Sequence, residues 1–284
     1  MEINAHTQFC GVIGNPVEHS LSPAIHNAAF QKLGLNCVYL AWKVEAIGDA
    51  IKGLRALGNF RGASVTVPHK VSAMSFLDHV EATARQIGAI NTIVAEKGQL
   101  TGYNTDATGA LRALREGGVE LTERRIVMLG SGGAARAIAF ALAAESGADK
   151  LTLLGVDDKE RAILAADVRS KTVLAVEDFH LDEAALGRTL PGAQVLIHCT
   201  PIGMSPKIDA SCVPASLLHA GLAVMDIVYH PRETRLLKDA KRAGCKTIPG
   251  LEMFLNQAVT QFNLWTNQLA PVDVMRAALE SRLQ

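Results

Sequence analysis

The sequence has few cysteines and no paired cysteine motif. Only five of its 284 residues are cysteine: Cys10, Cys37, Cys199, Cys212 and Cys245. No two of them form a C-x-x-C pair, and their number is odd, which argues against both a disulfide framework and a structural zinc site. We therefore expect a protein of a reducing compartment, the cytoplasm.

An excess of charge of one sign and a long apolar run are also missing. Lys plus Arg number 28, as do Asp plus Glu, so no overall field draws the chain to nucleic acid or to an anionic membrane. No stretch approaches the roughly 20 apolar residues that span a bilayer. Residues 1–8 are polar and lack the apolar region of a signal peptide. Secretion and membrane insertion are not expected.

The histidines lack the spacing of a metal site. His19, His26 and His69 do not form a motif such as H-E-x-x-H, so we interpret them as packing or hydrogen-bonding residues and expect no metal. The expected partner is a small-molecule substrate, and the oligomeric state is left open between monomer and homodimer.

What the sequence does have is an alternation of short apolar runs and amphipathic segments, typical of an α/β protein. The first series comprises strands at 9–13, 37–42 and 63–67, helices at 23–33 and 46–57, and a hairpin of 90–95 with 100–103. The second comprises strands at 126–129, 151–154, 173–175, 195–198 and 222–228, which indicate a parallel sheet wound by helices. We expect two α/β domains, with a long helix at 251–267 packing back on the first.

A glycine-rich loop lies between the first strand of the second series and the helix that follows. The loop comprises Gly130, Ser131, Gly132, Gly133 and Ala134. Glycines let the backbone approach a pyrophosphate, and the N-terminus of the next helix attracts its negative charge. Asp157 and Asp158 follow the next strand, where an acid can accept both ribose hydroxyls of an adenine dinucleotide. Strand, loop, helix, strand and acid in this order predict dinucleotide binding.

Polar residues follow the strand ends of the first series. Ser20 and Ser22 precede a helix and could hold a carboxylate, but Ser22 before Pro23 is also typical of a helix N-cap, which the segment alone favours. Lys70 lies just beyond a strand, where a lysine is usually a solvated surface residue and can also point into a ligand crevice. These alternatives stay open at this point.

Two further polar segments interrupt or end the hairpin. Asn91 and Thr92 interrupt a strand-like run, and Asp106 follows another immediately before a helix. Asp106 is interpreted most simply as a helix cap. An aspartate beside a lysine in a cleft would also form a proton-handling pair, because the carboxylate stabilises and orients the ammonium group.

Together these segments resemble the shikimate dehydrogenase family almost from end to end. The matching motifs are Gly14-Asn15-Pro16, His19-Ser20-Leu21-Ser22-Pro23, Ser64-Val65-Thr66-Val67-Pro68-His69-Lys70, Gly88-Ala89-Ile90-Asn91-Thr92, Asn104-Thr105-Asp106, the loop 130–134, and Gly250 with Met253 and Gln257-Ala258. The resemblance implies an α/β protein of two domains. One is a βαβ substrate domain, residues 1–106 with 250–284, and the other is a Rossmann-type doubly wound dinucleotide-binding domain, residues 107–249.

The resemblance also implies roles for individual residues. Ser20 and Ser22 would bind the carboxylate of shikimate; Thr66, Asn91, Asp106 and Gln257 would hold its ring hydroxyls; Tyr229 would border the substrate; Ile227 and Gly250 would lie at the nicotinamide end. Lys70 and Asp106 would be the catalytic pair. Because an unperturbed lysine has a pKa of about 10.4, proton donation to 3-dehydroshikimate is the easier direction for Lys70.

Two positions depart from the family pattern. Where the family carries an Asn-Arg-Thr group that grips the 2′-phosphate of NADP, this chain has Val156-Asp157-Asp158. Carboxylates there would repel a phosphate, so we expect NAD as the preferred cofactor and NADP to be disfavoured. Arg136 and Lys159 are the nearest basic residues that could rescue phosphate binding.

The second departure is Ser64, where the family commonly has asparagine. It raises the alternative of a paralogue acting on quinate or aminoshikimate, since quinate has an extra hydroxyl on the carboxylate-bearing carbon. A catalytically silent sensor of quinate-pathway metabolites is a further alternative. Retention of Lys70 and Asp106 argues against the sensor, and the sequence has no helix-turn-helix or basic extension.

Overall fold

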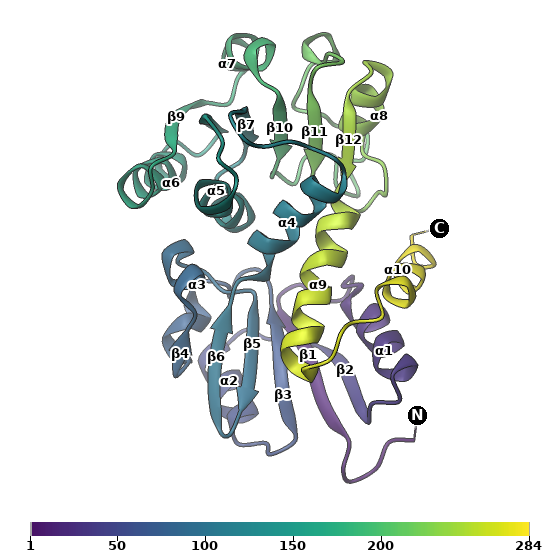
Figure 1. Ribbon diagram of the computed structural model, residues 1–284. Helices are drawn as coiled ribbons and strands as arrows, with labels where there is room; N and C mark the ends of the chain where they lie inside the picture. Colours follow the sequence, from purple (N-terminus) through teal and green to yellow (C-terminus); the bar gives the residue numbers. More distant parts are fainter. Residues whose placement is uncertain (1, 284) are drawn as a thin grey trace. The chain divides into compact units, whose positions relative to one another are not determined.

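The computed structural model describes residues 2–283 and divides the chain into two compact units. Unit 1 comprises residues 2–105 and 257–283, and unit 2 comprises Asp106–Asn256. Each unit contains one six-stranded sheet (Figure 1). The expectation of a two-domain α/β protein with a Rossmann-type fold is confirmed.

The sheet of unit 1 is mixed. Its strands are β1 (Gln8–Gly14), β2 (Cys37–Lys43), β3 (Phe60–Val65), β4 (His79–Val80), β5 (Thr92–Glu96) and β6 (Gln99–Tyr103), in the order β2-β1-β3-β5-β6-β4. β1 pairs in parallel with β2 and β3, whereas β5 is antiparallel to β3 and β6. The turn between β5 and β6 has Lys97 at φ 50° and Gly98 at φ 79°, as a tight hairpin requires.

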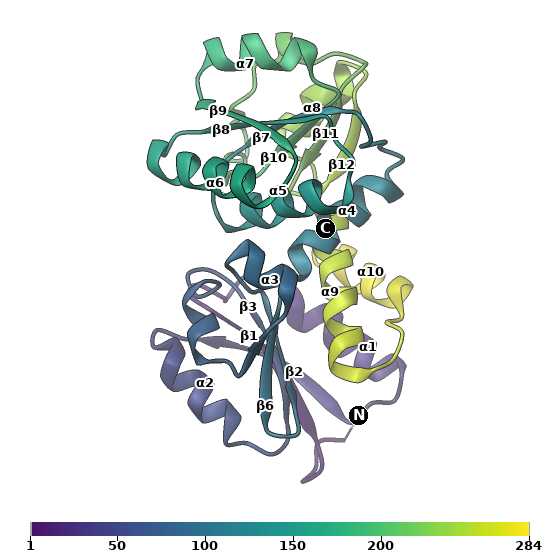
Figure 2. The same cartoon turned by 60° about the vertical axis from the view of Figure 1, so that its left-hand side comes forward.

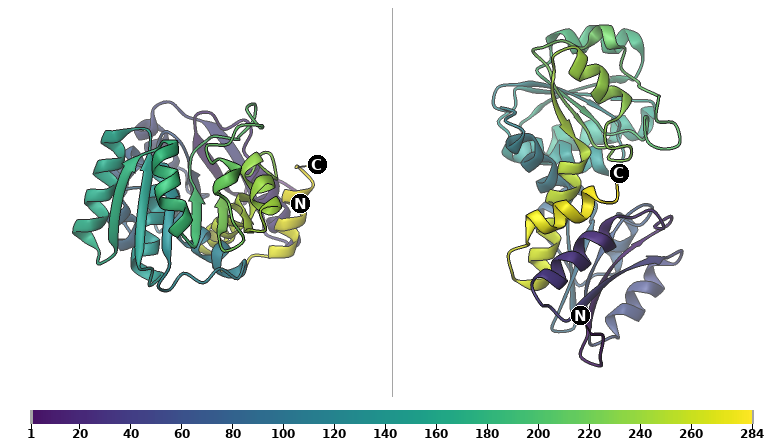
Figure 3. Two further views of the ribbon diagram at one scale, coloured as in Figure 1. Left: turned by 90° about the horizontal axis from the view of Figure 1, so that it is seen from above. Right: turned by 90° about the vertical axis from the view of Figure 1, so that its right-hand side faces the viewer.

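Helices cover both faces of this sheet. They are α1 (Ser22–Lys32), α2 (Ile47–Arg55), η1 (Ser72–Phe76), α3 (Ala82–Ile87), α9 (Gly250–Thr266, whose residues 250–256 belong to unit 2) and α10 (Val272–Glu280). α10 packs against α1 on the face opposite to α2 (Figures 2 and 3). Trp265 of α9 donates its indole N–H to the carbonyl of Ile93 at 2.9 Å, which joins this C-terminal helix to strand β5. The core on the α2 side is formed by residues such as Ile51 and Val65.

The sheet of unit 2 is entirely parallel. Its strands are β7 (Arg125–Leu129), β8 (Lys150–Gly155), β9 (Ala175–His180), β10 (Val195–His198), β11 (Ala223–Asp226) and β12 (Lys246–Pro249), in the order β12-β11-β10-β7-β8-β9. Read from β9, this is the doubly wound order 3-2-1-4-5-6 of dinucleotide-binding folds. Strands such as β7 are almost wholly buried, as a parallel sheet with two covered faces requires.

The helices of unit 2 lie on both faces of its sheet. They are α4 (Thr105–Glu116, whose first residue belongs to unit 1), α5 (Gly133–Glu145), α6 (Asp158–Lys171), α7 (Glu183–Thr189) and α8 (Arg235–Arg242), with the short turns η2 (Leu190–Gly192) and η3 (Ala215–Leu217). α5 and α6 lie on one face, and α7 and α8 on the other (Figure 2). The carboxyl ends of β7 and β8 therefore meet the N-termini of α5 and α6.

Some elements differ from the expected ranges. The strand expected at 173–175 begins only at Ala175, because α6 continues to Lys171 and Val173 lies fully exposed in the turn after it. β4 and β12 were not expected; the two residues of β4 are too few for an alternating pattern to show. No helix among residues 2–283 is long and apolar enough to cross a membrane.

Candidate functional site

In unit 1, the loops after β1 and β3 are joined by backbone hydrogen bonds. Asn15 N–H donates to Val67 O at 3.0 Å, and Thr66 N–H donates to Ile13 O at 2.9 Å. A Cβ at Gly14 would lie 2.3 Å from the Thr66 methyl group, so only glycine allows this approach. Thr66 is thereby held at the carboxyl end of β3, at the sheet edge where open α/β sheets bind ligands.

Lys70 follows the same loop and is joined to the segment before β5. Its carbonyl accepts the Ile90 N–H at 2.8 Å, and Asn91 N–H donates to Tyr103 O at 3.0 Å. The Asn91 side chain accepts Thr105 N–H at 2.7 Å and is 3% exposed. Because β5 is antiparallel to β3, its beginning lies at the end of β3, and the structure brings the segments of Thr66, Lys70 and Asn91 to one edge of the sheet.

Ser20 lies between β1 and α1 at that same edge, and Ser22 is the first residue of α1. The Ser22 N–H donates to the Ser20 Oγ at 3.3 Å. The N-cap residue of α1 is Leu21, whose side chain makes no cap hydrogen bond. The simple interpretation of Ser22 as an N-cap is therefore wrong, because the helix already begins at Ser22, and the side chain keeps its hydroxyl for other partners.

Two more predicted residues begin or continue helices. Asp106 is the second residue of α4, inside the first turn rather than at the cap position, and belongs to unit 2. Gln257 lies on α9 and is the first residue of the C-terminal part of unit 1. Both are buried, and both have polar interactions in the structure. Buried polar side chains require such partners, so neither is a solvated surface residue.

In unit 2, the glycine-rich loop has the conformation that its sequence predicts. Gly130 has φ 103°, and a Cβ there would lie 2.9 Å from the carbonyl oxygen of Cys199. The N-cap of α5 is Gly132, which offers no side-chain cap. The first N–H groups of α5 are thus left without a capping side chain, and Gly133 and Ala134 present them at the end of β7. This arrangement fits a pyrophosphate. Ser131 turns elsewhere, because its hydroxyl donates to Glu160 at 2.9 Å.

The segment after β11 packs against the start of α9. A Cβ at Gly250 would lie 2.5 Å from the carbonyl carbon and oxygen of Ile227, so only glycine permits this contact. Tyr229 packs its ring on Phe254 at 4.8 Å between centroids. Ile227, Tyr229 and Gly250 are therefore neighbours at the carboxyl ends of β11 and β12.

A buried ion pair that the sequence analysis missed holds this segment in place. His198 Nδ1 lies 2.8 Å from Asp226 Oδ1, and both side chains are almost completely buried. Asp226 also accepts Val228 N–H at 3.0 Å and the Thr234 hydroxyl at 2.6 Å. Burial opposes the imidazolium, but the hydrogen bonds with Asp226 and Cys212 outweigh it and raise the pKa of His198 to about 9. The sequence signal that could have revealed this pair is that His198 and Asp226 are the last residues of neighbouring parallel strands.

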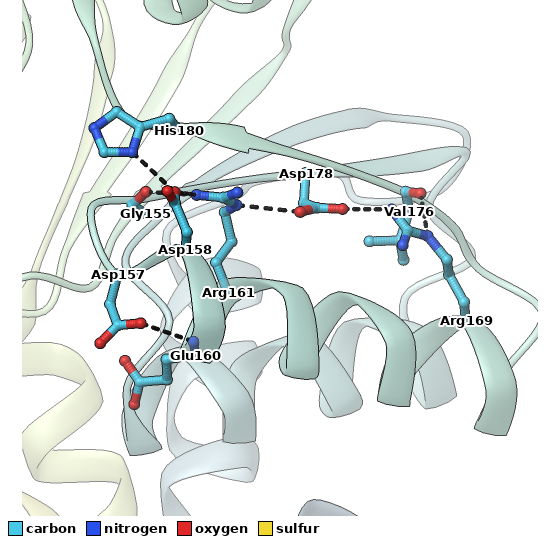
Figure 4. A network of polar contacts seen from close by, with 9 residues as sticks. All are labelled: Gly155, Asp157, Asp158, Glu160, Arg161, Arg169, Val176, Asp178 and His180. Atoms are coloured by element: carbon cyan, nitrogen blue, oxygen red, sulfur yellow. Dashed lines mark hydrogen bonds and ion pairs between the residues drawn. The ribbon is translucent and has the colours of Figure 1, made fainter.

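The acids after β8 are engaged in local contacts (Figure 4). Asp157 is the N-cap of α6 and accepts Glu160 N–H at 2.9 Å. Asp158 pairs with Arg161 and with His180 Nδ1, the latter at 2.9 Å. These contacts lower the pKa of Asp158, the His180 hydrogen bond most. Arg161 also bonds Asp178 at 3.1 Å, so the charge at this edge belongs to a network rather than to two isolated acids.

Comparison with known proteins identifies the family. The model of the shikimate dehydrogenase substrate binding domain matches residues 12–93, and that of the shikimate 5′-dehydrogenase C-terminal domain matches residues 250–280. A shikimate dehydrogenase (NADP(+)) of Moorella thermoacetica is 42% identical over 100% of this chain and 96% of its own length. One from Methanosarcina mazei, with the same name, is 45% identical over 98% of this chain and 99% of its own length.

Solved structures agree with this match. Shikimate 5-dehydrogenase from Listeria monocytogenes, in complex with shikimate and NAD, has a TM-score of 0.92 at 36% identity and covers 98% of both chains. A shikimate dehydrogenase in complex with NADP+ also has a TM-score of 0.92, at 39% identity, covering 100% of this chain and 98% of its own. Quinate dehydrogenase from Corynebacterium glutamicum, in complex with NAD, has a TM-score of 0.90 at 31% identity, covering 97% and 99%.

Fold, glycine-rich loop and full-length matches together define an NAD(P)-dependent oxidoreductase. Within that class, the chain belongs to the shikimate dehydrogenase family, as its sequence motifs indicated.

The expected preference for NAD over NADP is wrong. Relatives matched along the whole chain are named NADP(+)-dependent enzymes, and a neighbouring structure holds NADP+. The structure shows how the two acids after β8 are used. Asp157 caps α6, and Asp158 is paired with Arg161 and His180, so the charge of Asp158 is shared with two basic side chains.

Proposed function

We propose that this protein interconverts shikimate and 3-dehydroshikimate, with NADP(+) as the cofactor to test first. The observation that carries this proposal is the match at 42–45% identity along practically the whole chain to enzymes named shikimate dehydrogenase (NADP(+)). The arrangement within unit 1 supports it, because the segments of the serines, Thr66, Lys70 and Asn91 share one sheet edge. We propose that residues 1–106 with 250–284 act as the substrate domain and residues 107–249 as the dinucleotide domain.

The proposed roles are those that the family resemblance implies. Ser20 and Ser22 would offer hydroxyls to the carboxylate, Thr66, Asn91, Asp106 and Gln257 would hold the ring hydroxyls, and Tyr229 would border the substrate. When bound, the nicotinamide cofactor supplies or accepts the hydride. Lys70 holds the transferred proton on Nζ: as an ammonium group it donates the proton to the ketone oxygen, and Asp106 stabilises that charged form.

The dinucleotide would be held by elements of unit 2. The loop 130–134 and the uncapped N-terminus of α5 fit its pyrophosphate, because backbone N–H groups and the helix dipole favour an anion there. Ile227 and Gly250 would lie at the nicotinamide end, with Asp157 close to the adenosine ribose. Lys159, exposed in the first turn of α6, is the cation proposed for the 2′-phosphate of NADP(+).

Substitution of Lys70 tests the proposed catalysis. We expect Lys70→Ala to lower kcat for 3-dehydroshikimate reduction by a factor of about 10² to 10⁴, the usual range for a lost general acid, while shikimate still binds. Nicotinamide absorbance measures turnover, and calorimetry measures binding. Lys52→Ala, an exposed lysine of α2, is the matched control. Full turnover by Lys70→Ala would contradict the role of Lys70, and an inactive wild-type protein that still binds shikimate would favour the metabolite sensor.

A further inference from the structure

A buried imidazole joins the ends of two neighbouring strands of unit 2. His198 and Asp226 are the last residues of β10 and β11 and are direct partners in register. His198 Nδ1 lies 2.8 Å from Asp226 Oδ1, and His198 Nε2 is hydrogen-bonded to the hydroxyl of Thr200. His198 is almost completely buried, whereas Thr200 is half-buried. One ring nitrogen therefore contacts a buried carboxylate, and the other contacts a residue that a ligand can reach.

Thr200 lies beside the glycine-rich loop. A Cβ at Gly130 would lie 3.2 Å from the Thr200 methyl carbon and 2.9 Å from the carbonyl oxygen of Cys199. The Cys199 N–H donates to Leu129 O at 2.7 Å, which holds this segment at the end of β7. The Thr200 hydroxyl is therefore next to the loop that fits a pyrophosphate, where a donated proton would favour an anion.

The Asp226 carboxylate fixes the proton on one side of the imidazole ring. Asp226 accepts the Val228 N–H at 3.0 Å and the Thr234 hydroxyl at 2.6 Å. A carboxylate surrounded by donors is ionised and can only accept hydrogen bonds, so His198 Nδ1 must carry a proton. The charge of the ring then depends on whether Nε2 also carries one.

The state of Nε2 decides what the Thr200 hydroxyl can do. Thr200 Oγ1 already accepts the Ile202 N–H at 3.2 Å. In a neutral ring, Nε2 is an acceptor and takes the single hydroxyl proton. In a charged ring, Nε2–H donates to Oγ1, so both lone pairs of that oxygen are used and its proton is left for a ligand. No other described hydrogen bond among residues 2–283 uses the hydroxyl proton.

The surroundings of His198 favour the charged ring at neutral pH. Burial lowers its pKa, but Asp226 and Cys212, the titratable groups that act on the imidazole, outweigh burial and raise the pKa to about 9. Cys199 interacts with Asp226, and burial raises the pKa of its thiol, so it stays uncharged. Loss of the imidazolium proton would leave the buried Asp226 carboxylate without its counter-charge, which is unfavourable.

We propose that His198 is a positioning residue which, as an imidazolium ion paired with Asp226, makes Thr200 a hydrogen-bond donor toward the pyrophosphate of the dinucleotide. This inference rests on the proposed function, in which the loop 130–134 receives that pyrophosphate. The Nδ1 side of the ring holds the segment after β11, and the Nε2 side presents a proton beside the glycine-rich loop. NAD and NADP contain the same pyrophosphate, so the effect is the same for both.

The test measures the dissociation constants of NADPH and NADH by fluorescence titration at pH 7.5 and pH 10. Deprotonation of His198 turns the Thr200 proton back to Nε2. We expect the affinity for each cofactor to fall about five- to tenfold at pH 10, because about nine-tenths of a group is deprotonated one unit above its pKa and the lost hydrogen bond is to an anion. NADH lacks the 2′-phosphate, so an equal loss for both cofactors separates this effect from any contact of that phosphate.

Variants of Thr200 keep the buried ion pair and change only its readout. Thr200→Val lacks the hydroxyl and should bind both cofactors at pH 7.5 at least as weakly as the wild type binds them at pH 10, without further loss at pH 10. Thr200→Ser has a hydroxyl and should show the pH dependence again. His198→Asn removes the charge and should resemble Thr200→Val. His219→Asn, the same substitution at a histidine before β11 at the amino end of the sheet, is the matched control and should keep the wild-type profile.

The outcomes separate this inference from the proposed function. A wild type whose affinity does not change with pH, or a pH dependence that persists in Thr200→Val, would overturn the inference, because the Thr200 proton would then not be its source. The Thr200 variants decide this even where His198→Asn does not fold. Cofactor binding with the expected profile but without turnover of shikimate would contradict the proposed function alone. Failure of the wild type to bind either cofactor would overturn both.

Discussion

The two units bury a histidine in opposite ways. In unit 1, His26 is stacked on Tyr39 with 4.5 Å between ring centroids and packs against Trp265, and neither of its ring nitrogens has a hydrogen-bond partner among residues 2–283. Burial lowers its pKa to about 3. In unit 2, His198 is buried to the same degree, yet Asp226 and Cys212 raise its pKa to about 9. Burial therefore does not decide the charge of a histidine; the partner does.

The contrast extends to the polar interior of each unit. Unit 1 connects its buried hydroxyls and amides through neutral hydrogen bonds, from Tyr39 to Gln261. Unit 2 places a charged pair at the ends of two parallel strands, where Asp226 also fixes the turn before Tyr229. The buried hydrogen bonds of unit 1 join neutral groups, whereas the buried pair of unit 2 joins two opposite charges. The two units should accordingly respond differently to substitution and to pH.

The largest expected effect comes from removing the counter-charge of His198. Asp226→Ala leaves a buried imidazole without its ion-pair partner and Val228 N–H without its acceptor, so we expect unit 2 to lose about 3–5 kcal/mol of stability. Hydrogen exchange of amides in β10 and β11, followed by mass spectrometry, measures the loss. Asp226→Asn keeps the acceptor and is expected to lose less. Equal stability of wild type and Asp226→Ala would show that the ion pair does not stabilise unit 2.

A smaller effect is expected from pH in unit 2. The folded pKa of His198 lies above its unfolded value of about 6.5. Its contribution to the stability of unit 2 is therefore fully present below pH 6.5 and is lost as the pH rises through about 9. We expect the free energy of unfolding of unit 2 to fall by about 3 kcal/mol over this interval. Amide hydrogen-exchange rates, corrected for the intrinsic effect of pH on exchange, measure this change. His198→Asn should abolish that dependence, and a dependence that persists in this variant would come from another group.

The opposite pH effect is expected in unit 1. Because the pKa of His26 is depressed, its contribution to the stability of unit 1 is present above pH 6.5 and is lost as the pH falls toward 3. We expect about 2 kcal/mol less stability at pH 5 than at pH 6.5. Trp42 and Trp265, the only two tryptophans of the chain, both belong to unit 1, so their fluorescence during urea unfolding reports this unit alone.

His26→Leu should remove this acid sensitivity. The substitution replaces a buried neutral ring that has no described hydrogen bond, so stability at pH 7 should change little compared with stability at pH 5. His79→Gln, an exposed histidine of the same unit, is the control and should keep the wild-type profile. An acid profile unchanged by His26→Leu would place the titrating group elsewhere.

The smallest effect is expected from an exposed charge in unit 2. Lys159→Ala should weaken NADPH binding about two- to fivefold and leave NADH binding unchanged, because an exposed ion pair contributes little. Fluorescence titration of the reduced cofactors measures this difference. Lys150→Ala, at the amino end of strand β8, should change neither. Equal weakening of both cofactors would exclude a contact of Lys159 with the 2′-phosphate.

The sequence was sufficient for the features that depend on local chemistry. Alternating apolar runs indicated the α/β class, and the glycine-rich segment predicted a loop; in the structure Gly130 of this loop has φ 103°. Both signals are local, because side-chain periodicity and the freedom of glycine act within a few residues. The family motifs were equally readable from the chain. The roles of Lys70, Asp106 and the other site residues stay predictions.

The tertiary structure alone decided which polar groups are partners. The sequence shows two aspartates after β8, but only folding pairs Asp158 with His180 from the neighbouring strand and makes Asp157 a helix cap. The sequence shows that Ser64 departs from the family pattern. Only the packing of α9 brings Gln261 to that serine, so that the Ser64 hydroxyl donates a hydrogen bond to the Gln261 side-chain oxygen. Partners far apart in the chain meet through sheet order and helix packing, so the charge and hydrogen-bond direction of each site residue follow from the fold.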